Sequence, residues 1–241
     1  MPDHTIFNER PESQDRALKV IERLGYTIVP RSEAERKRGS RKAVLFTEEL
    51  QAFLSKQTYR FGSETRYFSG GAIARAMQAV DQHSAAGLYA ANKEIYELIC
   101  SGKSMEEELP DGTRQSFDIR YIDFEHPENN TFQVTDEFEV ERPNGRFARP
   151  DLVVLVNGIP LVVIECKKSS VDVMEGVTQN IRNWGEDYIP HLFRYAQLVM
   201  AMNPDKVLYG TCGTPAKYFV SWHEDNKDWL NDWCRNCLLY T

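Results

Sequence analysis

Two apolar segments near the middle of the chain place the strongest constraint on its fold. Leu152–Val156 and Leu161–Cys166 are apolar at nearly every position, and Asn157-Gly158 separates them. Strands that are buried on both faces show such continuous runs, whereas strands with one face in water alternate between apolar and polar residues. The two segments therefore predict paired central strands of a sheet that helices cover on both faces.

The surrounding patterns predict one α/β domain with a mixed central β-sheet flanked by helices. At 241 residues the chain is long enough to bury a substantial core. Residues 1–60 are interpreted as a helix-strand-helix part of the same domain, and residues 61–241 as its core. The expected elements are a helix, a strand and a second helix within residues 8–58, helices over 71–101, a hairpin centred on Asp111-Gly112, a strand from Phe132, helices over 171–188 and 190–202, and a strand over 206–209.

Three charged residues lie at the ends of the central strands. Asp151 precedes the first apolar segment, and Glu165 and Lys167 end the second. Because side chains alternate along a strand, Glu165 and Lys167 point to one face and Cys166 to the other. Charged groups at the mouth of an apolar core require partners or a metal ion. Two carboxylates match the oxygen ligands that magnesium prefers, and Lys167 is placed to orient or deprotonate an attacking water.

A structural interpretation of the same residues is a surface ion pair between Glu165 and Lys167, with Asp151 capping a turn. The apolar strands and the preceding Pro150 favour the catalytic interpretation. Lys168 is a weaker candidate, since alternation turns it away from Glu165.

The catalytic interpretation also constrains the turn between the two strands. With a plain two-residue turn at Asn157-Gly158, Asp151 faces Ile164 and Glu165 points to the opposite side. We therefore expect either an odd-length turn at Asn157-Gly158 or an irregularity near Pro150, which cannot donate a hydrogen bond to the ladder.

Charge and hydropathy limit the classes of function. The net charge is −7, from 29 Lys and Arg and 36 Asp and Glu, which argues against tight unaided binding of nucleic acid. No run approaches the roughly 20 apolar residues of a membrane span, so we expect an intracellular protein. The one dense basic stretch is interpreted as a solvated loop rather than a phosphate contact, and it comprises Arg31, Arg36, Lys37, Arg38, Arg41 and Lys42.

The five cysteines are scattered, as expected for reduced thiols. Only Cys234 and Cys237 have metal-like spacing, with His223 nearby. A zinc site needs about four ligands. No second pair completes such a site, and packing is the favoured interpretation.

Longer motifs resemble a known family. The chain resembles the amino-terminal nuclease domain of the restriction (R) subunit of type I restriction-modification enzymes, within the PD-(D/E)xK nuclease superfamily, from about residue 87 to 222. The residues that carry this resemblance are Ala91–Tyr96, Ile122–Phe124, Pro127–Asn130, Arg149–Asp151, Asn157–Leu161, Ile164–Lys167, Ile189–Phe193 and Gly213–Pro215.

The resemblance implies a type I site-specific deoxyribonuclease that cuts double-stranded DNA with Mg²⁺ after ATP-driven translocation. It implies modification and specificity subunits as partners, S-adenosylmethionine only through those partners, no membrane, and the cytoplasm of a bacterium or archaeon. The family joins the nuclease to a helicase-like motor, but this chain has no GxxxxGK(S/T) phosphate loop. We therefore expect a fragment that lacks the motor and does not bind ATP.

The resemblance also implies supporting residues. Gln179 and Arg182 lie at i and i+3 on one helical face and are candidates for site or DNA contacts, the alternative being a solvated face. Trp184 stands where the family often has Tyr, which leaves its role open. Glu94 is a candidate for a further metal-binding acid, the alternative being an ordinary surface glutamate.

Two other functions are kept as alternatives. One is a noncatalytic docking module that links a motor to methyltransferase subunits. The other is a nuclease of the same fold that acts on RNA or on a particular nucleic-acid structure.

Overall fold

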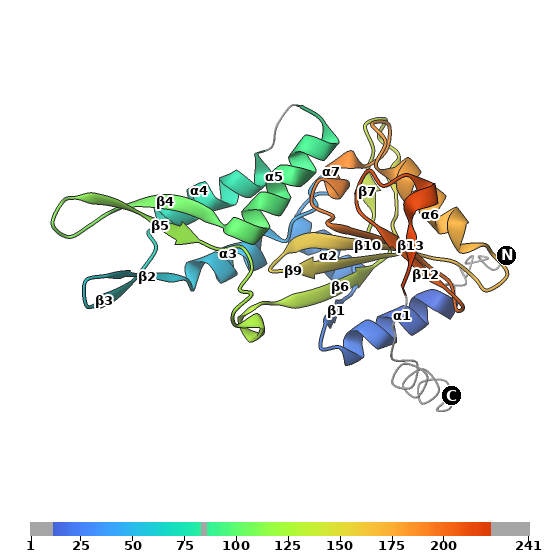
Figure 1. Cartoon of the computed structure of the whole chain (residues 1–241), viewed down its shortest axis with the longest axis horizontal. Coiled ribbons are helices and arrows are strands. Elements are labelled where there is room, and N and C mark those ends of the chain that lie inside the picture. Colours follow the sequence, from blue (N-terminus) through green and yellow to red (C-terminus); the bar gives the residue numbers. More distant parts are fainter. Residues whose placement is uncertain (1–11, 83–85, 223–241) are drawn as a thin grey trace, which may run out of the picture.

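The structure, a computed structural model, describes residues 12–82 and 86–222 (Figure 1). The Cys234–Cys237 pair and His223 lie outside the described residues. Of the helices that are described, none is long and apolar enough to cross a membrane.

A seven-stranded mixed sheet forms the centre of the molecule (Figure 1). The hairpin of β9 (Leu152–Val156) and β10 (Ile159–Cys166) pairs antiparallel, and β10 pairs parallel with β11 (Leu198–Met202). Both strands of the hairpin are largely buried, as their continuous apolar runs predict. In spatial order the strands are β1 (Thr27–Val29), β6 (Phe132–Asp136), β9 (Leu152–Val156), β10 (Ile159–Cys166), β11 (Leu198–Met202), β12 (Val207–Gly210) and β13 (Val220–Ser221).

Helices cover both faces of this sheet. The helix α1 (Glu12–Arg23) packs Ala17 and Leu18 against a layer that includes Ile164 and Cys166. On the other face, α6 (Val173–Asn183) packs Val173 and Val177 against β11 and β12. The remaining helices are α2 (Arg31–Arg38), α3 (Thr47–Ser55), α4 (Gly70–Asp81), α5 (Leu88–Ser101), α7 (Pro190–Phe193) and the short 3₁₀ turns η1 (Pro127–Asn129) and η2 (Ala216–Tyr218). The predicted α/β class and mixed sheet are confirmed.

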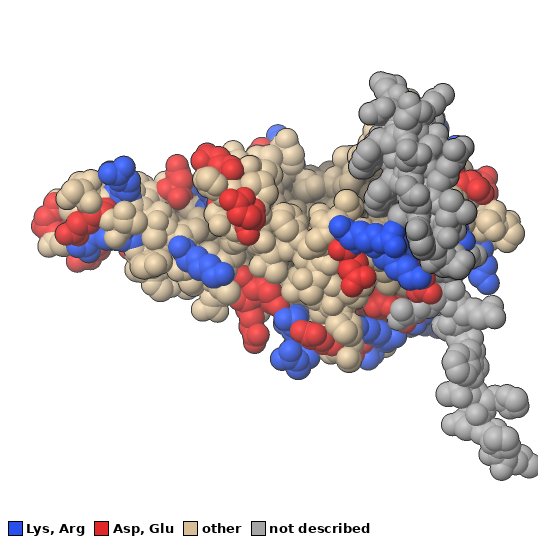
Figure 2. All heavy atoms as spheres, turned by 90° about the horizontal axis from the view of Figure 1, so that it is seen from below, with Lys and Arg blue, Asp and Glu red and all other residues tan. Residues whose placement is uncertain are grey.

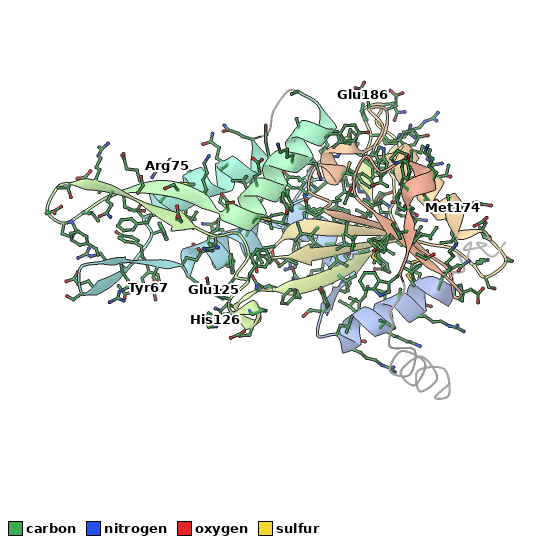
Figure 3. The ribbon with its side chains drawn as sticks, viewed as in Figure 1. Tyr67, Arg75, Glu125, His126, Met174 and Glu186 are labelled. Carbon is green, nitrogen blue, oxygen red and sulfur yellow. The ribbon has the colours of Figure 1, made fainter. Side chains whose placement is uncertain are left out.

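Two hairpins extend away from the sheet together with α3 and α4 (Figure 1). The first joins β2 (Thr58–Phe61) to β3 (Glu64–Tyr67), and the second joins β4 (Lys103–Glu108) to β5 (Arg114–Ile119). Figure 3 shows Tyr67 and Arg75 on this extension, with Tyr67 exposed. The Asp111-Gly112 hairpin was predicted, whereas the β2–β3 hairpin was not. A third hairpin, β7 (Val140–Glu141) with β8 (Phe147–Ala148), immediately precedes Asp151.

The helix predicted over 190–202 is wrong in its second half. Only Pro190–Phe193 is helical, and Leu198–Met202 forms β11 beside β10. A short apolar run fits a helix or a buried strand equally well, and pairing with β10 decides between them here.

The basic stretch is likewise not a solvated loop, because its first eight residues form α2. Its cations pair with acids: Arg31 and Arg41 lie 2.7 Å and 3.2 Å from Glu139, and Lys37 pairs with Glu49. On the face seen in Figure 2, Lys and Arg lie among Asp and Glu rather than in one patch. This neutralisation leaves the stretch poorly suited to bind phosphate.

The turn between β9 and β10 differs from both predicted arrangements. Val156 pairs with Ile159, so the turn has two residues, Asn157 at φ 50° and Gly158 at φ 81°, as a tight hairpin requires. The pairing then shifts between Pro160 and Val162, which makes Leu161 the additional residue of a β-bulge. Pro160 has no N–H to give to the ladder, which favours a bulge beside it. The expected one-residue shift therefore occurs in β10, not near Pro150.

Gly158 also approaches α3 closely. A Cβ at this position would lie 2.2 Å from the carbonyl oxygen of Phe46. The amide of Phe46 also donates a hydrogen bond to Gly158 O at 2.9 Å, which holds the two backbone segments together. The turn therefore fixes both the hairpin and the start of α3.

We expect Gly158→Ala to lower the free energy of unfolding by about 3 kcal/mol or more, from the positive φ and the clash together. Gly62→Ala is the matched control, since Gly62 has φ +60° but no atom within 4 Å of its added Cβ, and should cost only about 1–2 kcal/mol. Urea unfolding of both variants measures the difference. Equal losses would show that the contact with Phe46 is not a constraint.

Candidate active site

The bulge brings Asp151 and Glu165 to the same side of the sheet. Beyond it, Ile164 pairs with Leu152, so Asp151 and Glu165 occupy the next positions along the two strands. Cys166 points to the opposite face and packs in the layer beneath α1. The predicted alternation of Glu165, Cys166 and Lys167 is thus present. Asp151, Glu165 and Lys167 meet at the carboxyl end of β10.

The helix α6 lies directly over this end of β10 (Figure 1). Gly176 permits the close approach, because a Cβ there would lie 3.0 Å from Ala201 Cβ and 3.5 Å from Glu165 Cβ. Asp172 is the N-cap of this helix, and its carboxylate accepts a hydrogen bond from Met174 N at 2.9 Å. Asn180 anchors the helix to β11 by donating to Met200 O at 2.8 Å.

Gln179 connects the acid and the base of the site. Its amide nitrogen donates to Glu165 Oε2 at 2.6 Å, and its amide oxygen accepts from Lys167 Nζ at 2.6 Å. One turn further along α6, Asn183 Nδ2 donates to Glu165 Oε1 at 3.3 Å. Glu165 is 0% exposed, so these amides replace the water that a carboxyl group would otherwise bind.

Asp151 is held by backbone groups. Its Oδ2 accepts from Cys166 N at 2.7 Å, which ties it to the strand that carries Glu165. Its carbonyl oxygen accepts from Gln14 Nε2 of α1 at 3.3 Å and from Glu137 N at 2.8 Å. These contacts fix the main chain of Asp151 and one oxygen of its carboxylate.

Burial raises the pKa of both carboxyl groups. The pKa of Glu165 lies well above its ordinary value, because the group is desolvated and the charge of Asp151 opposes its ionisation. The pKa of Asp151 is also raised by burial, although the Cys166 amide and the Lys167 charge oppose that shift. The interaction between the two carboxyl groups lowers the pKa of Asp151 and raises that of Glu165, so Glu165 is the more readily protonated of the two.

This donor set fits a hard divalent cation. Two buried carboxyl groups at one place oppose each other's ionisation, and a bound cation relieves that repulsion. The amide oxygen of Asn183 is buried and has no hydrogen-bond partner within the described residues, so a neutral oxygen is also available. Asp151 and Glu165 would hold such a cation. No third His, Cys, Asp or Glu joins them in the parts of the chain that the structure describes.

The other predicted site residues have different positions. Arg182 is exposed, and its charge opposes the rise in the pKa of Glu165, which places the guanidinium near the carboxyls. Lys168 is exposed, in keeping with its weaker candidacy. Trp184 is buried and meets Phe193 edge-on at 5.8 Å, so it packs in the core.

Glu94 lies on α5, at the other end of β10. The neighbouring Asn92 donates to the carbonyls of Phe193, Arg194 and Ala196, which lead into β11. The strand β11 begins opposite Val162, three residues before Glu165, so Asn92 is anchored near the start of β10 rather than its carboxyl end. A role for Glu94 as a further metal ligand gains no support from this arrangement.

Sequence reasoning missed Asn183. Its spacing of four residues from Gln179 puts both on one helical face, so the signal was present.

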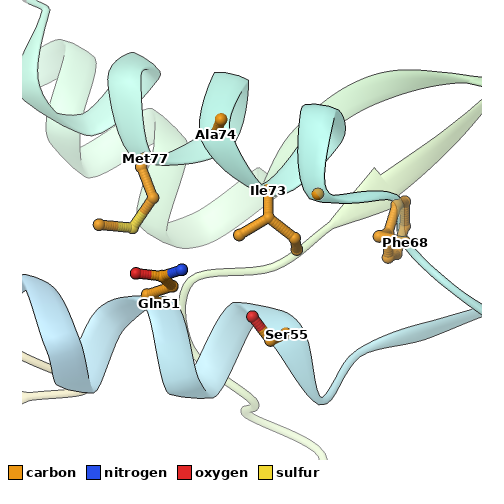
Figure 4. A pocket seen from close by; sticks show the side chains of 7 residues that line it. Gln51, Ser55, Phe68, Ile73, Ala74 and Met77 are labelled. Carbon is orange, nitrogen blue, oxygen red and sulfur yellow. The ribbon is translucent and has the colours of Figure 1, made fainter.

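A groove between α3 and α4 hollows the surface away from the carboxyl pair (Figure 4). None of its lining residues is ionisable, so it offers no group for acid, base or metal chemistry. They are Gln51, Ser55, Phe68, Gly70, Ile73, Ala74 and Met77.

A mixed sheet flanked by helices, with two carboxyls and a lysine at the end of its central hairpin, is the architecture of a restriction-endonuclease-like domain. The chain belongs to the family described as type I restriction enzyme R protein N terminus, whose model matches residues 6–218. The resemblance inferred from the motifs is thereby confirmed.

Individual relatives agree with this family. A putative type I restriction enzyme MjaIXP endonuclease subunit of Methanocaldococcus jannaschii is 33% identical over 138 residues, 56% of this chain and 13% of the relative. The type I restriction enzyme HindI endonuclease subunit of Haemophilus influenzae is 25% identical over 225 residues, 90% of this chain and 20% of the relative. The chain therefore spans a fifth or less of the length of these two curated relatives.

The raised pKa of Glu165 makes the stability of the metal-free chain depend on pH. The folded state keeps a proton that the unfolded state releases near the ordinary glutamate pKa, so the free energy of unfolding falls as pH rises from that value through the raised one. We expect Glu165→Gln to stabilise the metal-free chain at pH 7 to 8, with a gain that shrinks towards pH 5. Thermal unfolding across this range, with the exposed Glu48→Gln as control, measures the effect. A gain independent of pH would contradict the assigned protonation.

Proposed function

We propose that this chain is the DNA endonuclease domain of a type I restriction enzyme R subunit, a site-specific deoxyribonuclease that hydrolyses phosphodiester bonds of double-stranded DNA with Mg²⁺. The observation that carries the proposal is the buried Asp151–Glu165 carboxyl pair, with Lys167 joined to it through Gln179. The family match supports the same reaction.

In this proposal Asp151 and Glu165 hold the Mg²⁺ ion, and Glu165 gives up its proton to do so. When bound, the ion polarises the phosphate and lowers the pKa of a coordinated water. Lys167 carries a positive charge beside both carboxyls, where it orients the attacking water and offsets charge that develops on the phosphate. Gln179 fixes the distance between Lys167 and Glu165 through its two hydrogen bonds.

The larger assembly is also part of the proposal. Residues 1–60 and 61–241 form one nuclease domain, an arrangement supported by the pairing of β1 with β6. The motor that uses ATP lies elsewhere in the full-length protein, and this chain does not bind ATP. Modification and specificity subunits join the R subunit in the bacterial or archaeal cytoplasm and bring S-adenosylmethionine with them.

We expect Asp151→Ala or Lys167→Ala in the full-length protein, assembled with its partner subunits, to lower the rate of Mg²⁺-dependent DNA cleavage by about 10²-fold or more, since each removes a group that acts at the phosphate. Gel assays of plasmid cleavage measure the rate, and ATP hydrolysis by the same complex should be unchanged.

Lys168→Ala is the matched control, because it removes the adjacent, exposed lysine. Cleavage at the unsubstituted rate by Asp151→Ala and Lys167→Ala would favour the noncatalytic docking module. Preferential cleavage of RNA would favour a nuclease of another substrate class.

A second prediction concerns Gln179. Gln179→Ala leaves Glu165 and Lys167 without their shared partner, so we expect a drop of about 10- to 100-fold in Mg²⁺ affinity or cleavage rate. Calorimetry and cleavage assays report the two quantities. Thr178→Ala, which alters the exposed neighbour on α6, should change neither. If Gln179→Ala also behaves like the unsubstituted protein, the two hydrogen bonds do not position the site.

A further inference from the structure

Tyr188, in the loop between α6 and α7, contacts two arginines from different parts of the chain. The guanidinium of Arg142 lies 3.9 Å from the centre of its ring, and that of Arg182 lies 5.3 Å away. Arg142 follows β7 and also donates through Nε to the carbonyl oxygen of Asp187 at 3.1 Å. The β7–β8 hairpin and the α6–α7 loop therefore lie side by side, as Figure 1 shows.

Within residues 12–82 and 86–222, neither Arg142 nor Arg182 forms an ion pair with a carboxylate. The cations around α2, by contrast, are paired with glutamates. Two like charges at one ring repel each other, and an anion between them relieves that repulsion.

The acidic residues of the same loop do not fill this role. Asp187 contributes only its carbonyl oxygen, and Glu186 lies at the outer end of the loop (Figure 3). A ligand from outside the described chain is therefore the better candidate for the missing anion.

Arg182 lies near the carboxyl pair, because its charge acts on Glu165, and Arg142 contacts the same Tyr188 ring as Arg182. Arg182 directly precedes Asn183, which donates to Glu165. The hairpin that carries Arg142 returns through Pro150, whose carbonyl accepts from Phe138 N at 3.1 Å, straight into Asp151. An anion bound here is next to the site at which cleavage is proposed.

We propose that Arg142 and Arg182, which both contact the ring of Tyr188, bind a backbone phosphate of the DNA strand next to the phosphate that is cleaved. The inference rests on the proposed nuclease function and adds a binding site to it. Tyr188 acts as a positioning residue, since its ring orients both guanidinium groups. Planar guanidinium groups suit this role because each offers several donors to phosphate oxygens.

The test measures binding of a 20-base-pair duplex by the 241-residue chain, with Ca²⁺ in place of Mg²⁺ to prevent cleavage. Fluorescence anisotropy over a range of salt concentrations gives the affinity and its salt slope. We expect Arg142→Gln and Tyr188→Ala to weaken binding, and Arg142→Gln to reduce the slope of log K against log salt by about one. Arg142→Gln keeps a donor for the Asp187 carbonyl, so the loop contact survives while the charge is lost.

Three controls complete the experiment. Tyr188→Phe retains the ring and should retain binding, whereas loss of binding in Tyr188→Phe would contradict the positioning role. Arg41→Ala removes one cation from the glutamate-paired group and should leave the slope unchanged. Inorganic phosphate should displace the duplex only weakly. Binding of inorganic phosphate by a chain that does not bind the duplex would indicate a free-phosphate site and overturn the proposal.

An unchanged affinity and slope in Arg142→Gln, or no duplex binding by the unsubstituted chain, would also overturn it. Asp151→Asn separates the two proposals, because it should abolish Mg²⁺-dependent cleavage while duplex binding persists. Duplex binding that depends on Arg142, combined with cleavage that does not depend on Asp151, would support the phosphate site and reject the carboxyl pair as the site of cleavage.

Discussion

The additional residue in β10, Leu161, sets the side of the sheet on which every later side chain of that strand lies. With Leu161 outside the pairing, Val163 and Glu165 face α6, and Ile164 and Cys166 face α1. A regular hairpin would place the Glu165 carboxyl in the apolar layer beneath α1, without the amides of Gln179 and Asn183. The polar cluster of the site therefore depends on a single shift of register beside Pro160.

Burial of Glu165 shapes the rest of the site. A carboxyl group without water requires hydrogen-bond partners, and α6 supplies two amides from one face. The same burial raises the pKa of the group, so the metal-free protein retains a proton where a cation would bind. The arrangement lowers the stability of the ionised metal-free chain and prepares two oxygen-donating groups for a cation. Functional sites commonly combine local destabilisation with such preparation.

The basic side chains of the domain fall into two groups, those paired with glutamates and those available to a ligand. Around α2, arginine and lysine pair with glutamates from α3 and from the segment after β6, and these pairs fix the helix to the domain. Near the carboxyl pair, Arg142 and Arg182 share an aromatic ring instead. An acidic chain with net charge −7 can thus present cations without ion pairs near the proposed phosphate site.

The sequence by itself determined the central hairpin, the class of fold and the candidate catalytic residues. The apolar runs indicated buried strands, and Asp151, Glu165 and Lys167 stand out because charged groups at the mouth of an apolar core require partners or a metal ion. Only the tertiary structure decided that 198–202 is a strand and not a helix, since its pairing with β10 overrides an ambiguous local pattern. The bulge at Leu161, the position of Glu94 at the far end of β10 and the meeting of Arg142 with Tyr188 were also decided there. Each depends on contacts between segments distant along the chain, and local periodicity carries no information about such contacts.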